Sequence, residues 1–416
     1  MQQIRANDPL LKVLFPDGIS EPSYKQSKII GLMKKDTTFD GEGVKYVTVS
    51  IAPGAGGSSN MSEAIANQGS TQEVRFTLGR KKLYEVGSID GELMAAGRSK
   101  KGAIVDVVRH ALDKARYAYG RAQSRTIWGN GGGARGRIAN GSNVATPTIS
   151  LTNVSDAAGF FKGMWMQLSS DDGTGGAGVR DNGTKVQLGS IKRDSAGVAS
   201  LTLASGNWNQ IIGATAGATG DFIFRAGDYA NVPTGVRGWN PEVEPGGSDS
   251  FLGINRGTAG DVNYLSGWRV SGAGQPKNQT LIDATAEIRN AGITRELMGF
   301  VNPLDLRDAF KDLSQLKVIP VQTDNPKVGY KGIELLGSAG SSTIFDEVDV
   351  PRGFCWFEDP KTWTQRSAGD VPMILDFDGI KTFLRNPLGD NYQFRFGGYY
   401  NNEQAEPGEA VIASFA

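Results

Sequence analysis

The sequence predicts an α+β protein with a long β-hairpin, a long helix and a separate small β-domain. Alternating β-type runs at residues 44–51 and 73–78 flank a tip rich in glycine, serine and alanine. Apolar residues then recur at three- and four-residue spacing from residue 104 to residue 127, which is typical of a helix. Short strand patterns separated by turn signals fill residues 146–225.

The hairpin carries little to pack within itself, because Met61 and Ile65 are the large apolar residues of its tip. A two-stranded hairpin is at best marginally stable in water, so we expect it to lie on another surface. That surface belongs either to its own fold or to a neighbouring subunit. In the second case the expected contact residues are Tyr46, Val49, Ile51, Met61, Ile65, Val74 and Phe76.

Length and composition limit the function. The 416 residues exceed the usual size of a single core, so two or three sub-domains are expected. Lys+Arg 44 balances Asp+Glu 44, which argues against a protein held to nucleic acid mainly by phosphate neutralisation. The N-terminus lacks a signal-peptide pattern and no apolar run is long enough for a bilayer, so we expect a soluble cytoplasmic product without a membrane partner.

The remaining segments follow in order. Residues 1–36 carry Pro9, Pro16 and Pro22 without a sustained period and predict an extended arm. The apolar face of the long helix is mostly alanine, which permits close packing in the centre of a fold. After residue 231 the pattern is mixed, with Asn302 and Pro303 predicted to start a helix that runs to about residue 313. Strands and turns fill the rest.

No residue pattern predicts catalysis, a cofactor or a metal. His110 lies within the long helix without a triad-like motif, and Cys355 lies in an apolar β-type run typical of a buried, inert thiol. The glycine-rich stretch 129–136 follows a helix and lacks a phosphate-loop ending, so we interpret it as a helix terminator. Carboxylate groups at Asp171-Asp172, at 346–349 and at 376–378 lack calcium-loop spacing and are expected to be solvated turns.

Basic residues greatly outnumber acidic ones between Arg98 and Arg137. One interpretation is a helix whose polar flanks pair with carboxylates from other segments. The other is a positive face that meets a polyanion without sequence specificity. In the second interpretation the residues that face DNA would be Arg109, Lys114, Arg116, Arg121 and Arg125.

This order of parts resembles the major capsid protein of tailed bacteriophages, whose shells have the Hong Kong-type fold. The stretch 300–306 is similar to that family's strand-to-helix junction in the axial domain. Similar closing strands and turns are found at residues 330–337, 349–353, 359–363 and 405–408. The resemblance covers the chain except for about residues 145–230.

The resemblance implies a non-enzymatic shell subunit with six parts. These are an N-terminal arm at 1–36, an extended hairpin loop at 37–90, a spine helix and the start of a peripheral domain at 91–144, an inserted β-domain at 145–230, an axial domain at 231–350, and C-terminal strands at 351–416. It further implies assembly with itself into hexamers and pentamers of an icosahedral head in the host cytoplasm. Packaged double-stranded DNA would be held weakly, and scaffold, portal and decoration proteins are implied partners. Some members cross-link through a lysine in the loop, but residues 52–72 contain none.

Two alternatives stay open. An encapsulin-like nanocompartment shares the implied fold and carries protein cargo in place of DNA. A carbohydrate-binding or hydrolytic β-protein is a rival of another class, in which Trp165, Trp208 and Asp171 would form a sugar site, although both tryptophans also suit a core.

Overall fold

A computed structural model describes residues 27–41, 43–52, 56–92, 101–194, 197–212, 220–312, 320–321, 332–337, 340–375, 384–385 and 389–415. The arm predicted at residues 1–36 therefore lies mostly outside the described residues. Its end forms α4 (Lys28–Leu32) and β1 (Lys34–Asp36). The carboxylate group predicted at residues 376–378 is also outside.

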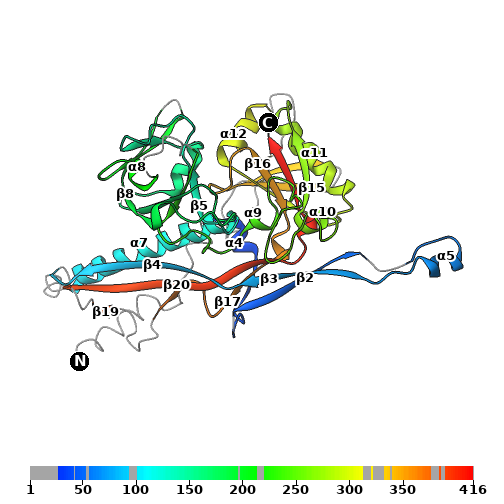
Figure 1. Ribbon diagram of the computed structural model, residues 1–416, viewed down its shortest axis with the longest axis horizontal. Helices are drawn as coiled ribbons and strands as arrows, with labels where there is room; N and C mark the ends of the chain where they lie inside the picture. The colour runs from blue at the N-terminus through cyan, green and yellow to red at the C-terminus, as the bar shows by residue number, and fades with distance from the viewer. Residues whose placement is uncertain are drawn as a thin grey trace.

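The lower part of the molecule is a long ribbon of two antiparallel strands, β4 (Lys81–Asp90) and β20 (Asn391–Gln404) (Figure 1). Helix α7 (Lys101–Ile127) lies along one face of the ribbon. Leu112 and Tyr119 of the helix share a buried cluster with Phe394 and Phe396. A Cβ at Gly87 would come within 2.0 Å of the Phe394 ring, so the close packing of this face requires glycine there.

Four short strands complete this sheet. Strand β17 pairs with β20 on one side and with β1 on the other, where the pairing is parallel. The strands are β1, β17 (Trp363–Ser367), β18 (Met373–Ile374) and β19 (Leu384–Arg385). Through β1, the N-terminal segment becomes part of the same sheet as the C-terminal half of the chain.

A small β-domain follows α7 and lies above the ribbon in the view of Figure 1, with Arg225 of the domain paired with Glu85 of β4. Its strands, in spatial order, are β5 (Ala134–Arg137), β10 (Phe222–Arg225), β7 (Trp165–Ser169), β8 (Val186–Arg193), β9 (Ala199–Leu203) and β6 (Thr148–Ser150). A bridge between Ile138 and Leu151 joins the first strand to the last and closes the sheet into a barrel. Closure leaves no free sheet edge, and the interior is filled by apolar side chains, which include Ile211 of α8 (Asn209–Ile212).

The second large body is a seven-stranded sheet. Its strands, in spatial order, are β11 (Trp268–Gly272), β21 (Val411–Phe415), β16 (Phe354–Glu358), β12 (Met298–Val301), β15 (Gly340–Asp346), β14 (Gly332–Gly337) and β13 (Pro320–Val321). Helices α11 (Lys277–Asn290) and α12 (Pro303–Asp312) pack with it, and α9 (Val236–Trp239) and α10 (Val262–Ser266) lie nearby. The Oδ1 atom of Asn302 accepts from the Leu304 N–H at 3.1 Å, which confirms the predicted N-cap.

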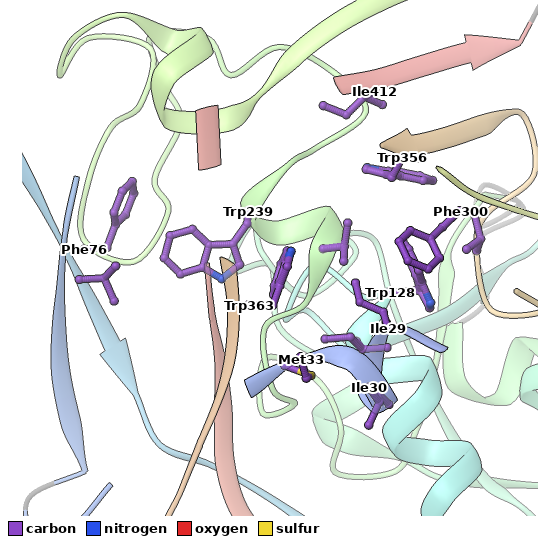
Figure 2. Close-up of a cluster of buried hydrophobic side chains, with 14 of the residues drawn as sticks. Ile29, Ile30, Met33, Phe76, Trp128, Trp239, Phe300, Trp356, Trp363 and Ile412 are labelled. Carbon is purple, nitrogen blue, oxygen red and sulfur yellow. The ribbon is translucent and has the colours of Figure 1, made fainter. Parts of the chain in front are cut away.

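One aromatic core joins these bodies. Trp128, which directly follows α7, packs against Phe300 and Trp356 of the seven-stranded sheet, with ring centroids 5.4 Å and 6.0 Å away (Figure 2). Trp239 and Trp363 are also fully buried in this cluster, together with Ile29 and Ile30 of α4. The core therefore ties the N-terminal segment, the long helix and both large sheets together.

Candidate functional site

The candidate site is the hairpin formed by β2 (Val44–Ala52) and β3 (Gln72–Gly79), which projects from the body and ends in a short helix, α5 (Met61–Ala66) (Figure 1). The strands pair antiparallel, with Val47 opposite Phe76 and Val49 opposite Val74. Side chains of a strand point alternately to its two faces, so these four share one face of the hairpin.

The inner face of the hairpin belongs to the chain's own core. Val49, Val74 and Phe76 are buried there, and the Phe76 ring lies 5.1 Å from that of Trp239. The structure thus places three predicted neighbour-contact residues inside this subunit, because strand alternation directs them to the body. The side chain of Ile51 lies outside the described residues.

Replacing Phe76 with alanine tests this assignment. The ring is fully buried and packs edge-on against Trp239 and Phe251. Phe76→Ala is expected to lower the free energy of unfolding by roughly 3–5 kcal/mol, because it leaves a cavity in the core. Urea denaturation of the isolated subunit measures this. A loss of about 0.5 kcal/mol or less, the usual size at a surface position, would mean that Phe76 is not part of the subunit's own core and would make it a candidate for contact with a neighbour.

The outer face and the tip of the hairpin remain exposed. Tyr46 is 60% exposed, with the Arg75 guanidinium 5.3 Å from its ring centroid. In α5 the Oδ1 atom of Asn60 accepts from the Ser62 N–H at 3.0 Å and caps the helix. Met61 and Ile65, one helical turn apart, are 76% and 64% exposed, and α5 buries no residue.

A six-residue helix is too short to be stable alone in water, so its formation needs a packing partner. Within the described chain its apolar pair, Met61 and Ile65, has no cover. The tip is therefore the part of the hairpin that is suited to bind another surface.

Some basic side chains between Arg98 and Arg137 form hydrogen bonds within the subunit. Arg121 donates to both oxygens of Asp349, at 3.1 Å and 3.2 Å, and the Arg125 guanidinium donates to the carbonyl oxygen of Arg135. Arg121 agrees with the interpretation in which the flanks of the helix pair with carboxylates from other segments, whereas Arg125 is held by a backbone carbonyl. Lys114 is exposed and Arg116 half-buried. The side chain of Arg109 lies outside the described residues.

The prediction that the carboxylates at residues 346–349 lie in a solvated turn is wrong for Glu347 and Asp349. Glu347 is 4% exposed and the Asp349 side chain 1%, so neither is in a solvated turn. Burial raises the pKa of Glu347 to about 7, against the lowering effect of hydrogen bonds from Trp128, Ser27 and the backbone N–H groups of Ile29 and Lys28. Their partners lie hundreds of residues away in sequence, so no local pattern could reveal this role.

The rival sugar site does not form. Trp208 is fully buried in the barrel and donates its Nε1–H to the Pro147 carbonyl at 3.0 Å. The Asp171 carboxylate is occupied by its own turn, accepting from the N–H groups of Ala177 at 2.8 Å and Gly173 at 3.1 Å. Trp165 is 51% exposed, so one of the three residues remains open to solvent as an aromatic surface.

Of the two other candidate residues, the structure describes the side chain of Cys355. Cys355 is fully buried and burial raises the pKa of its thiol, which confirms the prediction of a buried thiol. The side chain of His110 lies outside the described residues. In the part of the chain that the structure describes, no three acidic, histidine or cysteine side chains are grouped to hold a metal ion. Within those same residues, no helix has the length and apolar character to span a membrane.

Comparison with known proteins supplies the fold. No protein-family model and no curated protein sequence matches the chain. A chain of the capsid asymmetric unit of cyanophage A-1(L) aligns over 93% of this chain and 91% of its own length, with a TM-score of 0.51 and 11% identity.

Two further solved structures align over most of the chain at lower similarity. The capsid of a native GTA particle aligns over 96% of this chain and 92% of its own, with a TM-score of 0.44 and 9% identity. The holo-SrpI encapsulin of Synechococcus elongatus aligns over 95% and 88%, with a TM-score of 0.41 and 7% identity. On the A-1(L) alignment, which includes nearly the whole of both chains, this chain has the phage capsid fold.

Proposed function

We propose that this chain is a major capsid protein, which self-assembles into hexamers and pentamers of an icosahedral head enclosing double-stranded DNA. The observation that carries the proposal is the near-complete alignment with a cyanophage capsid chain. The exposed apolar tip of the hairpin supports it, since a subunit that works alone gains nothing from presenting Met61 and Ile65 to water.

In this proposal each part of the chain has a place in the shell. The hairpin within 37–90 is the extended loop that reaches a neighbouring subunit, and α7 is the spine of the peripheral domain. The seven-stranded sheet, with residues 231–350, forms most of the axial domain. The barrel is an inserted domain whose strands span Ala134 to Arg225, so it starts earlier than the 145–230 predicted from sequence. Scaffold, portal and decoration proteins are the proposed partners of the assembled shell.

Assembly energy would come from many similar contacts. Each tip buries its apolar pair on a neighbour, and every subunit repeats the contact, so modest interfaces add up to a stable shell. The chain's own core already holds the base of the hairpin through Phe76 and its neighbours. The direction of the projecting tip is therefore fixed in the free subunit, which lowers the loss of conformational entropy when it docks.

Electron microscopy of the purified, expressed protein tests the proposal directly. Closed particles of uniform diameter are expected, and nuclease-resistant DNA within particles made during infection separates a phage head from an encapsulin-like compartment. A compact monomer at high concentration, in the presence of a scaffold as well as alone, would contradict the proposal. Particles that hold protein cargo and no DNA would favour the compartment.

Contact with DNA is expected to depend on two basic residues of α7: Lys114, which is exposed, and Arg109, whose side chain lies outside the described residues. Lys114→Gln combined with Arg109→Gln should lower the DNA retained per particle while shells still form. The slope of retention against the logarithm of salt concentration should fall by about 2, roughly one for each phosphate contact. Lys192→Gln, at an exposed position on the barrel strand β8, is the matched control. If the double variant retains as much DNA as the wild type, Lys114 is an ordinary solvated residue without a role in DNA contact.

A further inference from the structure

The loop that follows β15, from Asp346 to Val350, is the meeting point of three parts of the chain. Its backbone is fixed to the seven-stranded sheet, since the Glu347 N–H donates to the Val301 carbonyl at 2.9 Å. The buried Asn302 side chain donates to the Val350 carbonyl at 2.8 Å. We call residues 346–350 the carboxylate loop.

The Glu347 carboxylate holds the N-terminal segment. It accepts from the Ser27 hydroxyl at 2.9 Å, from the Ile29 N–H at 3.2 Å and from the Lys28 N–H. The first N–H groups of a helix have no partner within it, so this carboxylate satisfies the start of α4. Helix α4 then buries Ile29 and Ile30 in the aromatic core (Figure 2).

The same carboxylate also binds the end of α7. Trp128 Nε1 donates to Glu347 at 2.7 Å, and the indole is 1% exposed and packs against Phe300 and Trp356. The N-terminal segment and the long helix therefore share one buried acceptor, and a change in the position of either alters the hydrogen bonds of the other.

Asp349 fixes the preceding turns of α7. Both of its oxygens accept from Arg121, and one also accepts from the Ser124 hydroxyl at 2.6 Å. A bidentate arginine pair fixes orientation as well as distance. Because Asp349 is two residues from Glu347, the loop sets the position of α7 relative to the acceptor that the N-terminal segment uses.

We propose that the carboxylate loop couples docking of the N-terminal segment, residues 27–36, to the alignment of α7 with the seven-stranded sheet. When α7 moves away from the sheet, Trp128 leaves Glu347 and the hydrogen-bonded anchor of α4 is disturbed. By reciprocity, release of the segment weakens the hold on α7. This coupling is a property of the single subunit and does not depend on shell assembly.

Asp349→Asn tests the coupling, because Asp349 has no hydrogen bond or ion pair with residues 27–36 among those found in the described chain. Hydrogen exchange of the unassembled full-length chain, followed by mass spectrometry, gives the protection of the peptide 27–36. We expect it to exchange roughly five-fold faster or more in the variant, the lower end of usual coupling strengths. Ser124→Ala removes one bond to Asp349 and should act in the same direction with a smaller effect, so the test survives if Asp349→Asn folds poorly.

Asp221→Asn is the matched control. Asp221 also holds an arginine through both oxygens, each at 2.9 Å from Arg180, and is 4% exposed, but it lies beside the barrel. Its loss should leave exchange at 27–36 within about two-fold of wild type, well below the coupled effect. The coupling is wrong if Asp221→Asn accelerates exchange of that peptide as much as Asp349→Asn does, or if Asp349→Asn and Ser124→Ala both leave it unchanged.

The reverse direction is tested with Ser27→Ala. Ser27 is 1% exposed and its hydroxyl donates to Glu347. Faster exchange in the helix peptide 121–128, with the barrel peptides unchanged, is the expected result. Unchanged exchange at 121–128 while residues 27–36 loosen would show that the segment is anchored without coupling and would overturn the proposal.

Discussion

A variant with both apolar residues of the tip replaced, Met61→Ser with Ile65→Ser, is expected to fold normally and to fail to form closed shells at wild-type concentrations. Both side chains are mostly exposed in the subunit, so their loss should change its free energy of unfolding by no more than about 0.5 kcal/mol. On a neighbour, each buried side chain contributes roughly 1.5–3 kcal/mol. The two together make each contact weaker by about 3 kcal/mol or more, which raises the concentration needed for assembly roughly 100-fold.

Size-exclusion chromatography and electron microscopy across a concentration series measure this shift. Val198→Ser, an exposed apolar position on the barrel, controls for the loss of surface apolarity in general. Deletion of Pro53 to Thr71 should give the same soluble, assembly-defective subunit. Closed shells from the double variant at the wild-type threshold would falsify the docking role of the tip.

The sequence was sufficient for the elements whose cause is local. The spacing of apolar residues predicted the helix that is α7 and its end near Ile127, and Asn302 with Pro303 predicted the start of α12. Turn residues between short apolar runs predicted the barrel strands from β6 to β10. Strand β5 (Ala134–Arg137) was missed, because the glycine-rich stretch 129–136 was interpreted as a helix terminator. Closure of the barrel could not be predicted from the sequence, because the bridge between Ile138 and Leu151 depends on how the first and last strands of the sheet meet in space.

The candidate site was predicted less well, since its face assignments depend on tertiary contacts. Alternation identified the strands of the hairpin but not which side the body covers, so Val49, Val74 and Phe76 were grouped with the exposed Tyr46. Glu347 and Asp349 were missed for a related reason. Their partners, Ser27 and Arg121, are far away in the chain, and a run of acidic residues looks the same whether it is solvated or buried.

A second buried carboxyl group, Glu358, gives the stability of the subunit a predictable dependence on pH. It lies at the end of β16 with no exposed area, and Oε2 accepts from Gln404 Nε2 at 2.9 Å and from Trp363 Nε1 at 3.2 Å. Oε1 has no hydrogen-bond partner within the described residues. Burial raises the pKa of Glu358 from 4.5 to about 8, with the neighbouring Asp359 adding to the rise and the two hydrogen bonds opposing it.

The sign follows from which state keeps the proton. Between pH 4.5 and about 8 the unfolded chain releases the Glu358 proton while the folded chain retains it. The unfolded state then binds fewer protons, so the free energy of unfolding falls as pH rises through this window and levels off above it. Glutamine has the same shape and stays neutral, so Glu358→Gln removes this loss.

We therefore expect Glu358→Gln to unfold with nearly wild-type stability at pH 5, to exceed the wild type increasingly up to about pH 8, and to keep an excess on the order of 4 kcal/mol at pH 9. Urea denaturation of both proteins at matched pH values gives the difference in their free energies of unfolding. The contributions of the other titrating groups, including Glu347, cancel in this difference. Glu296→Gln shows the effect of the same chemical change at an exposed position. A difference between Glu358→Gln and wild type that is equal at pH 5 and pH 9 would mean that Glu358 ionises as readily in the folded chain as in water. Burial beside Trp363 and Gln404 would then not raise the free energy needed to ionise the Glu358 carboxyl group.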